Sequence, residues 1–442
     1  MRSQEWVTVP IRDVYLEFHD GLHATPKPSD IGQIYLGIDN LREDGRLDFS
    51  ETKHISNHDF ERWTRRVTPE SGDVVFTYEA TLHRYAVIPE GFRGCLGRRV
   101  ALIRPNPEVV DSHFLLYYFL SPDWYGTVRS NVNTGSTVDR IPLVAFPDFL
   151  IRVPPLVTQR RIACILSSYD NLIENNRRRI QILEEMARAI YLEWFVHFRF
   201  PGLEEVEMVD SEMGEIPEGW TQLPFTSLAE FQNGYAFAPK HWQKEGKPIV
   251  KIAEMKDGIG GTTSYYHGDD IPENYHIATG DLLFAWSASL CVRFWTGGDA
   301  LLNQHIFRVL PKNGFSRAFL FHSIQTKIAD FQSRTQGTTM RHIRRSALDE
   351  VHLPVPPNEC MSKFDALVVP MTELRIKLEV INKALSRIRD LLLPKLVSGE
   401  IDVSYLETEA APPNTHQTSK YKGQSTIDQW TDGVDQDADM GR

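Results

Sequence analysis

The residue types that carry out catalysis are present in this chain, but they do not fall into a familiar spacing. No GxxxxGK[ST] segment offers a phosphate-binding loop, and no Asn-Pro-Pro-aromatic or Asp-Pro-Pro-aromatic motif of a base-flipping amino-methyltransferase occurs. The fifteen histidines include no HExxH pair for zinc. Pro147-Asp148 is not followed by the acid-x-Lys segment that a nuclease-like motif needs. The sequence therefore predicts no catalytic residues and no metal site.

Cysteine usage and hydropathy predict a cytoplasmic protein that does not enter a membrane. Cys95, Cys164, Cys291 and Cys360 lie far apart and form no CxxC pair, which is typical of a reduced compartment. The longest apolar run, residues 114–120, is far shorter than the about 20 residues that span a bilayer. The N-terminus lacks the apolar core of a signal peptide.

The formal net charge of −11 is concentrated in two segments. Residues 204–218 hold seven acidic residues and no base, and residues 402–442 hold eight acidic residues and three bases. The remainder of the chain therefore carries a net charge of about +1. Because two segments that we expect to be solvated carry nearly all of the charge, it neither indicates nor excludes binding to nucleic acid.

The elements that would position binding residues occur twice. NTGSTVDRIPLVAFPDFLIRVPP at 133–155 matches TQGTTMRHIRRSALDEVHLPVPP at 335–357, and SGDVVFTYEATLHRYAV at 71–87 matches TGDLLFAWSASLCVRFW at 279–295. A repeat of about 200 residues is far longer than a solenoid unit, so we interpret it as a duplicated domain. Short runs of β-branched and aromatic residues broken by Gly and Pro predict strands, and each copy also contains a helical stretch. Each copy is therefore expected to be an α+β domain.

A long helix with a heptad seam is predicted after the double proline that ends each copy. Steps of three and four residues connect the first seam: Ile162, Leu166, Tyr169, Ile173, Asn176, Ile180, Leu183, Ala187 and Ile190. The same steps connect the second seam: Leu374, Leu378, Ile381, Leu385, Ile388 and Leu392. Pro370 predicts a kink or a late start of the second helix, and Pro394 predicts its end. Two such seams in one chain most simply bury each other as an antiparallel pair.

Asn176 interrupts the first seam with an amide. A buried polar layer costs stability but penalises wrong registers and wrong partners, so we predict that Asn176 fixes the register of the pair. The alternative is that Asn176 lies at the edge of the seam and is solvated.

Several of these segments together resemble the specificity subunit of type I restriction-modification enzymes. The first long helix begins after a proline pair with a Gln-x-x-Ile motif at 159–162 and ends in Trp194-Phe195, like the central conserved helix of that family. GEIPEGW at 214–220 resembles the entry into its second recognition domain, and LLLPKLVSGEIDV at 391–403 resembles its distal conserved region. The second helix departs from the pattern because it lacks the Gln-x-x-Ile opening.

The resemblance implies an α+β fold with two similar globular target recognition domains, separated by a pair of long antiparallel coiled-coil helices and related by a pseudo-twofold internal repeat. The expected boundaries are a first target recognition domain at 1–157, a central conserved long helix at 158–200, an acidic linker at 201–218, a second target recognition domain at 219–357, a distal conserved long helix at 358–399, and a disordered acidic tail at 406–442.

The resemblance also implies a function. The chain would be the DNA recognition subunit of a type I complex, in which each repeat reads one half of an asymmetric bipartite site, and the helices set the spacer and dock modification subunits. Expected partners are double-stranded DNA, two modification (methyltransferase) subunits and, where present, restriction (translocase/nuclease) subunits. The chain itself would be non-catalytic and bind no cofactor, with S-adenosylmethionine, ATP and Mg on the partner subunits of the adenine-N6 methyltransferase and endonuclease. The alternatives are a coiled-coil scaffold that binds proteins only, and a DNA-modifying enzyme of unrecognised type.

Basic residues on loops are the candidates for the DNA contacts that this resemblance implies, because guanidinium groups bind guanine edges and phosphates. The candidates are Arg65, Arg66, Arg93, Arg98 and Arg99 in the first copy, and Arg334, Arg341, His342, Arg344 and Arg345 in the second. The alternative for each is a solvated surface charge. Specificity is expected where the two copies differ.

Overall fold

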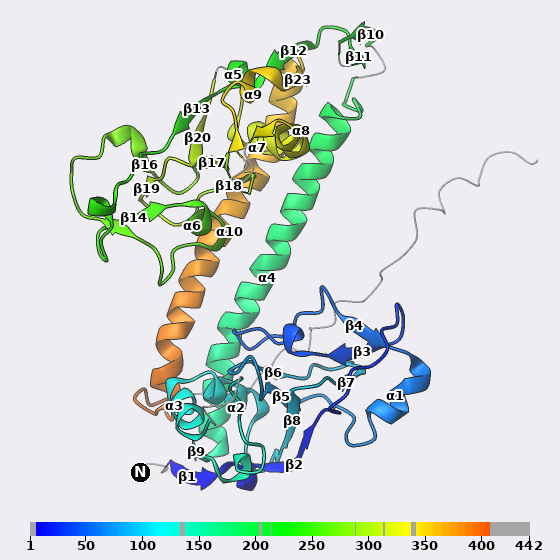
Figure 1. Cartoon of the computed structure of the whole chain (residues 1–442), viewed down its shortest axis with the longest axis vertical. Helices are drawn as coiled ribbons and strands as arrows, with labels where there is room; N and C mark the ends of the chain where they lie inside the picture. The colour runs from blue at the N-terminus through cyan, green and yellow to red at the C-terminus, as the bar shows by residue number, and fades with distance from the viewer. Residues whose placement is uncertain are drawn as a thin grey trace, which may run out of the picture. The chain divides into compact units, whose positions relative to one another are not determined.

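A computed structural model of the chain describes residues 6–132, 138–202, 206–212, 214–287, 289–312, 314–336 and 342–406. The chain divides into two units, one formed by residues 1–171 with 387–442 and the other by residues 172–386. Each unit holds one globular copy together with parts of the two long helices, α4 (Leu156–Phe195) and α10 (Asn358–Val397), which run without interruption (Figure 1).

The strands of the first copy form two small sheets and one terminal pair. They are β1 (Val7–Pro10), β2 (Tyr15–Asp20), β3 (Gln33–Leu36), β4 (Lys53–Ile55), β5 (Val74–Thr77), β6 (Tyr85–Val87), β7 (Gly94–Leu96), β8 (Val100–Pro105) and β9 (Leu150–Val153). An antiparallel sheet has the order β2-β8-β5-β6, and a second sheet has the order β4-β3-β7 with β3 and β7 parallel. β1 pairs with β9, Val7 lying opposite Val153, so the first and last strands meet where α4 begins.

The three short α-helices of the first copy begin at side-chain caps. The α-helices before α4 are α1 (Asn57–Trp63), α2 (Ser112–Phe119) and α3 (Pro122–Asn131), and the 3-10 helices are η1 (Ile11–Val14), η2 (Ile38–Asn40) and η3 (Phe146–Asp148). The carboxylate of Asp111 accepts from two backbone N–H groups at the start of α2, and Ser121 caps α3 with Pro122 in its first turn. α2 is buried from Phe114 to Phe119, so it forms the centre of the core.

The second copy repeats this topology. Its strands are β10 (Met208–Ser211), β11 (Gly214–Pro217), β12 (Thr221–Pro224), β13 (Ala229–Asn233), β14 (Lys247–Val250), β15 (Tyr265–Tyr266), β16 (His276–Ile277), β17 (Leu282–Ala285), β18 (Cys291–Phe294), β19 (Ala300–Leu302), β20 (Ile306–Pro311), β21 (Thr335–Gln336), β22 (His342–Ile343) and β23 (His352–Val355). The order β13-β20-β17-β18 matches β2-β8-β5-β6, and β14 lies parallel to β19 as β3 does to β7. β12 pairs with β23 as β1 does with β9.

The helices of the second copy also follow the first. They are α5 (Phe225–Leu228), η5 (Pro239–His241), α6 (Ile252–Asp257), η6 (Glu273–Tyr275), α7 (Arg317–Thr326), α8 (Ile328–Ser333) and α9 (Ala347–Glu350). One buried ion pair recurs, because Arg104 donates to Asp73 at 3.0 Å in the first copy and Arg308 to Asp281 at 3.0 Å in the second. The predicted internal repeat and α+β fold are confirmed.

The Gln-x-x-Ile opening of α4 joins that helix to the first copy. The side chain of Gln159 is buried, accepts from the backbone N–H of Asp111 at 2.9 Å, and donates to the carbonyls of Val109 and Pro154 at 3.0 and 2.8 Å. Met361 of α10 occupies the position that matches Gln159 and is buried, so an apolar contact replaces this polar one in the second copy.

The predicted antiparallel pairing of the long helices is confirmed within each unit. The start of α4 and the end of α10 share the core of the first unit, where Ile162 and Leu166 pack in one cluster with Leu396. The end of α4 and the start of α10 share the core of the second unit, where the ring centroids of Trp194 and Phe364 are 6.1 Å apart.

The expected late start of the second helix is wrong. α10 begins at Asn358 and runs through Pro370, which costs a helix about 3 kcal/mol. Phe364 and Val368 are buried on the preceding turns, and this packing outweighs the local preference.

The seam of α4 lies on the face that we expected. Ile162, Leu166, Ile173 and Asn176 are buried, and Tyr169, Ile180, Leu183 and Ile190 are partly buried.

The predicted seam of α10 is wrong at Leu374, Ile381 and Ile388, which are 38, 46 and 42% exposed, whereas Leu378 is buried and Leu385 and Leu392 are partly buried. After each of these three exposed residues, the next residue along the chain faces α4 instead, and that residue is polar. The inward positions are Phe364, Val368, Met371, Arg375, Leu378, Asn382, Leu385, Arg389 and Leu392.

Two further segments were predicted from the sequence, an acidic linker and an acidic tail. The acidic stretch 201–218 is not only a linker, because it contains the antiparallel pair β10 and β11. The predicted tail lies outside the described residues from 407 onward. Within the described ranges, no helix is both long enough and apolar enough to cross a membrane.

Candidate nucleic-acid interface

The five arginines predicted in the first copy lie on loops, and two of them have acidic partners. Arg65, Arg93 and Arg98 are exposed. The guanidinium of Arg66 lies 2.6 Å from Asp20, and that of Arg99 lies 2.9 Å from Glu79.

The residues predicted in the second copy are more dispersed. Arg334 pairs with Glu350 at 3.5 Å, and Arg345 donates to a backbone carbonyl at 3.4 Å. Arg344 and His342 are exposed. Arg341 lies outside the described residues.

Arg66 and Arg99 belong to a polar cluster at one edge of the first copy, which we call the first edge. It consists of Asp20, His23, Arg66, Tyr78, Glu79, Arg99 and Arg140. The carboxylate of Glu79 lies between two guanidinium groups, 2.9 Å from Arg99 and 3.8 Å from Arg140. Arg140 also covers the ring of Tyr78 at 5.7 Å, and Asp20 lies 2.6 Å from both His23 and Arg66.

The first edge is held by backbone bonds that bring three distant segments together. The N–H of Tyr78 donates to the carbonyl of Arg99 at 3.2 Å, and the N–H of Ile141 donates to the carbonyl of Tyr78 at 2.8 Å. Burial, and then the negative charge of Asp20, raise the pKa of Tyr78, so its hydroxyl stays protonated at neutral pH.

The same backbone bonds recur in the second copy and define a second edge. The N–H of Trp286 donates to the carbonyl of His305 at 3.3 Å, and the N–H of Ile343 donates to the carbonyl of Trp286 at 3.1 Å. The second edge consists of Trp286, Ser287, Gln304, His305 and His342. The Trp286 Nε1 and His305 Nδ1 atoms are buried and have no hydrogen-bond partner within the described part of the chain.

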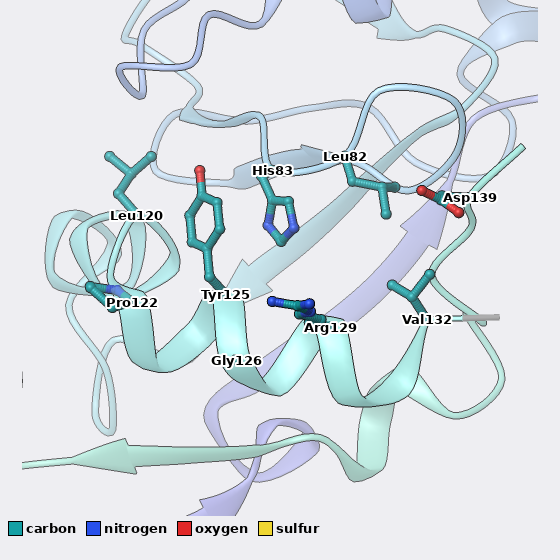
Figure 2. Close-up of a pocket in the computed structure, with 9 residues that line it drawn as sticks. All are labelled: Leu82, His83, Leu120, Pro122, Tyr125, Gly126, Arg129, Val132 and Asp139. Atoms are coloured by element: carbon teal, nitrogen blue, oxygen red, sulfur yellow. The ribbon is translucent and has the colours of Figure 1, made fainter. Parts of the chain in front are cut away.

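A groove of about 790 Å³ lies beside the loop between β5 and β6 in the first copy (Figure 2). Leu82 and His83 of that loop face Tyr125 and Arg129 of α3, and the rings of His83 and Tyr125 stack 4.0 Å apart. Burial lowers the pKa of His83, so its ring is neutral at physiological pH. The left-handed backbone of His83, with a φ of 64°, directs the loop toward α3.

The long helices carry three polar layers at heptad spacing on α10. Arg375 lies 2.8 Å from Glu184, Asn382 accepts from the amide of Asn176 at 2.9 Å, and Arg389 lies 2.5 Å from Asp170. The amide of Asn382 also donates to the carbonyl of Ile173 at 3.2 Å. Asn176 is therefore paired inside the seam, and the alternative of a solvated Asn176 is wrong.

The two outer layers also join each copy to the helices within its own unit. The hydroxyl of Tyr117 on α2 donates to Asp170 at 2.6 Å, and burial followed by the charge of Asp170 raises the pKa of this tyrosine. In the other unit, the guanidinium of Arg375 covers the rings of Phe294 and Phe321 at 5.6 and 5.1 Å.

Sequence inspection for basic clusters missed most of both edges. Tyr78, Glu79, Arg140, Trp286 and His305 belong to no basic cluster, and the segments that carry them are far apart in the chain. The available signal was the alignment of the matched segments, in which Tyr78, Glu79 and Arg140 lie opposite residues of a different type; no matched segment covers His305.

Neither edge resembles a metal centre. Among the residues that the structure describes, no three His, Cys, Asp or Glu side chains gather in a way that could hold a metal ion.

Comparison with known proteins identifies the family. The model described as the type I restriction modification DNA specificity domain matches residues 30–185 and 217–367, once in each copy. The MjaIX specificity subunit of Methanocaldococcus jannaschii is 24% identical over 377 residues, covering 80% of this chain and 83% of the relative. The HindI specificity subunit of Haemophilus influenzae is 23% identical over 368 residues, covering 68% and 80%.

A solved structure shows the same fold. The S subunit of a type I restriction-modification system from M. genitalium is 13% identical, covers 90% of this chain and 97% of its own, and has a TM-score of 0.55. Because the family model matches both copies and more than half of the residues, the chain belongs to the type I restriction-modification DNA specificity family.

Proposed function

We propose that this chain is the DNA recognition subunit of a type I complex and that each copy reads one half of a split, asymmetric DNA site. The observation that carries the proposal is the presence of two family domains on one scaffold whose edges differ in chemistry. Two similar readers suit the near-twofold symmetry of duplex DNA, and their different side chains require different half-sites.

We propose further that the long helices set the spacing between the half-sites. A helix of 40 residues is roughly 60 Å long at 1.5 Å per residue, which corresponds to more than one turn of DNA. The pairing of Asn176 with Asn382 opposes slippage of one helix along the other, because any shift would leave both amides buried without partners. A fixed register gives a fixed spacer length.

The exposed stripe on α10 is the surface on which we propose that modification subunits dock. Leu367, Leu374 and Ile381 recur every seven residues and are 46, 38 and 46% exposed. A regular apolar stripe on a helix whose opposite face is already packed is suited to contact with a partner helix. A Leu374→Glu/Ile381→Glu variant is expected to lose copurification with the modification subunit, whereas Lys377→Glu, a charge reversal on the same helix, is expected to retain it.

In this proposal the chain is non-catalytic. Two modification subunits supply the adenine-N6 methyltransferase and bind S-adenosylmethionine, and restriction subunits, where present, use ATP and Mg. The chain's own residues recognise DNA and position these partners in a reduced cytoplasm.

The test is the methylation map of the host genome, read by sequencing that detects N6-methyladenine, with and without this gene. Loss of methylation at one asymmetric split motif is the expected result. If deletion of the gene leaves the map unchanged while the modification subunit is expressed, the proposal is wrong, and a protein-binding scaffold becomes the better explanation.

A further inference from the structure

We infer that the first edge and the second edge are the base-reading surfaces of the two copies, and that four pairs of equivalent residues give them different specificities. This inference rests on the proposed function and assigns it to particular side chains. The pairs are Tyr78 with Trp286, Glu79 with Ser287, Arg99 with His305, and Arg140 with His342, and Gln304 beside His305 adds an amide to the second edge.

The equivalence of these residues follows from backbone geometry. Tyr78 directly follows β5, and Trp286 directly follows β17, the equivalent strand. The backbone carbonyl of each accepts from the N–H of a buried isoleucine, Ile141 or Ile343. In each copy the next residue forms an isolated antiparallel bridge, Glu79 with Arg140 and Ser287 with His342. The two edges are thus one backbone arrangement that carries two sets of side chains.

The arrangement is suited to specificity because the scaffold beneath both edges is shared. Phe76 and Phe284 are both fully buried behind the edges, as are Ile141 and Ile343. The residues behind the edges are of the same type in the two copies, whereas the four edge pairs all differ in charge or hydrogen-bonding capacity.

The first edge presents charged donors and acceptors. The carboxylate of Glu79 accepts hydrogen bonds, which matches the N4 amino group of cytosine, and the guanidinium of Arg140 matches guanine. Arg140 and Arg99 are accessible, with 46 and 32% of their side chains exposed, while Glu79 between them is held in place. The geometry therefore points to a G·C pair within the half-site of the first copy.

The second edge presents an indole, a hydroxyl, two imidazoles and an amide. Gln304 is exposed, and its side chain can bind adenine through two hydrogen bonds. The Trp286 Nε1 and His305 Nδ1 atoms are buried beneath this edge and no described residue satisfies them, so an ordered water is their natural partner. The geometry points to an adenine within the half-site of the second copy.

The experiment uses the full chain expressed with its modification subunits in a host that lacks the system. Genomic methylation is sequenced for the wild type, for Glu79→Gln and Arg140→Ala in the first edge, and for Gln304→Ala and His305→Ala in the second. The controls are Arg42→Ala, an exposed arginine of the first copy paired with Asp48, and Lys244→Ala, an exposed lysine of the second.

Variants of the first edge are expected to relax one position of one half-site, with a loss of discrimination of about tenfold or more, and to leave the other half unchanged. Variants of the second edge are expected to relax the other half, and the controls should reproduce the wild-type motif. Copurification with the modification subunits and an unchanged melting temperature separate this result from misfolding, which would remove methylation at the whole site.

Two outcomes would overturn the inference: edge variants that assemble normally and keep the wild-type motif, or edge variants that weaken both halves equally. A wild-type complex that methylates no split motif would instead refute the proposed function itself.

Discussion

Asn176 and Asn382 form the contact that we expect to fix the register between α4 and α10. Each amide has a partner inside the seam, in the middle one of its three polar layers, and Asn382 also donates to the backbone of α4. Single replacement leaves a buried polar group unsatisfied, whereas replacement of both amides by apolar groups removes that penalty.

We expect Asn176→Leu to lower the free energy of unfolding of the chain by about 1–3 kcal/mol. The double variant Asn176→Leu/Asn382→Leu should recover this loss. Urea denaturation followed by circular dichroism measures both values, and Asn175→Leu, on the exposed neighbouring position, serves as the matched control. A single variant as stable as the wild type would show that the amide pair does not hold the register.

His322 makes the stability of the second copy depend on pH. Its ring is buried against Tyr191, 5.6 Å away, and burial followed by the charges of Arg375 and Arg188 lowers its pKa to about 4 from an ordinary 6.5. Below pH 6.5 the unfolded chain binds a proton that the folded chain does not bind until about pH 4. Folded-state stability is therefore complete above pH 6.5 and falls as the pH falls toward 4.

The expected loss from this residue is on the order of 2–3 kcal/mol across that range. His322→Phe should flatten the dependence of the melting temperature on pH between about pH 5 and pH 7. His197→Gln, an exposed histidine of the same unit, should leave the dependence as it is. An unchanged slope in His322→Phe would contradict the assignment.

At the scale of elements, we expect α4 and α10 to act as one paired spacer. The polar residues of α10 follow one another at intervals of seven, and each has a partner on α4 within its own unit. A change in helix length should therefore transfer directly to the distance between the two readers.

Insertion of four residues into each long helix, beside Asn176 and beside Asn382, lengthens the helices by about 6 Å, which is roughly two base pairs. Deletion of four residues from each should have the opposite effect. The methylation map of the assembled complex should show a motif with the same half-sites and a changed spacer, while four residues inserted after Gly202 should leave the spacer unchanged. A constant spacer length in the helix variants would refute the proposal that the helices set the spacing between the half-sites.

At the scale of the whole molecule, the formal net charge of −11 does not indicate whether the chain binds DNA. The acidic residues are concentrated in residues 204–218 and 402–442, and the remainder is close to neutral. We therefore expect DNA binding to depend on local arginine positions and on the partner subunits.

We expect the assembled complex to bind a duplex with the split motif in a strongly salt-dependent way. Six to ten phosphate contacts would reduce the affinity by about 10³–10⁵-fold between roughly 50 and 200 mM salt, because counterions are released on binding. Electrophoretic mobility shifts at several salt concentrations measure this slope, with a scrambled duplex as the control. Absence of salt-dependent binding by a complex that contains its modification subunits would favour the protein-only scaffold.

Much of this architecture could be predicted from the amino-acid sequence by itself. The aligned segments at 71–87 and 279–295 established the duplication, and the Gln-x-x-Ile and Trp-Phe motifs of the first long helix carried the family resemblance. These features are local: periodicity, capping residues and double prolines act over a few turns of chain.

Only the tertiary structure decided which face of α10 is buried and which residues meet at each edge. Apolar periodicity favoured Leu374 and Ile381, yet Arg375 and Asn382 are the inward residues, because α4 supplies the partners that make their burial possible. Likewise Glu79, Arg99 and Arg140 become one cluster only when strand pairing closes long loops between them. A polar side chain can be placed inside or outside only when its partner is known, and that partner is set by packing between segments far apart in the sequence.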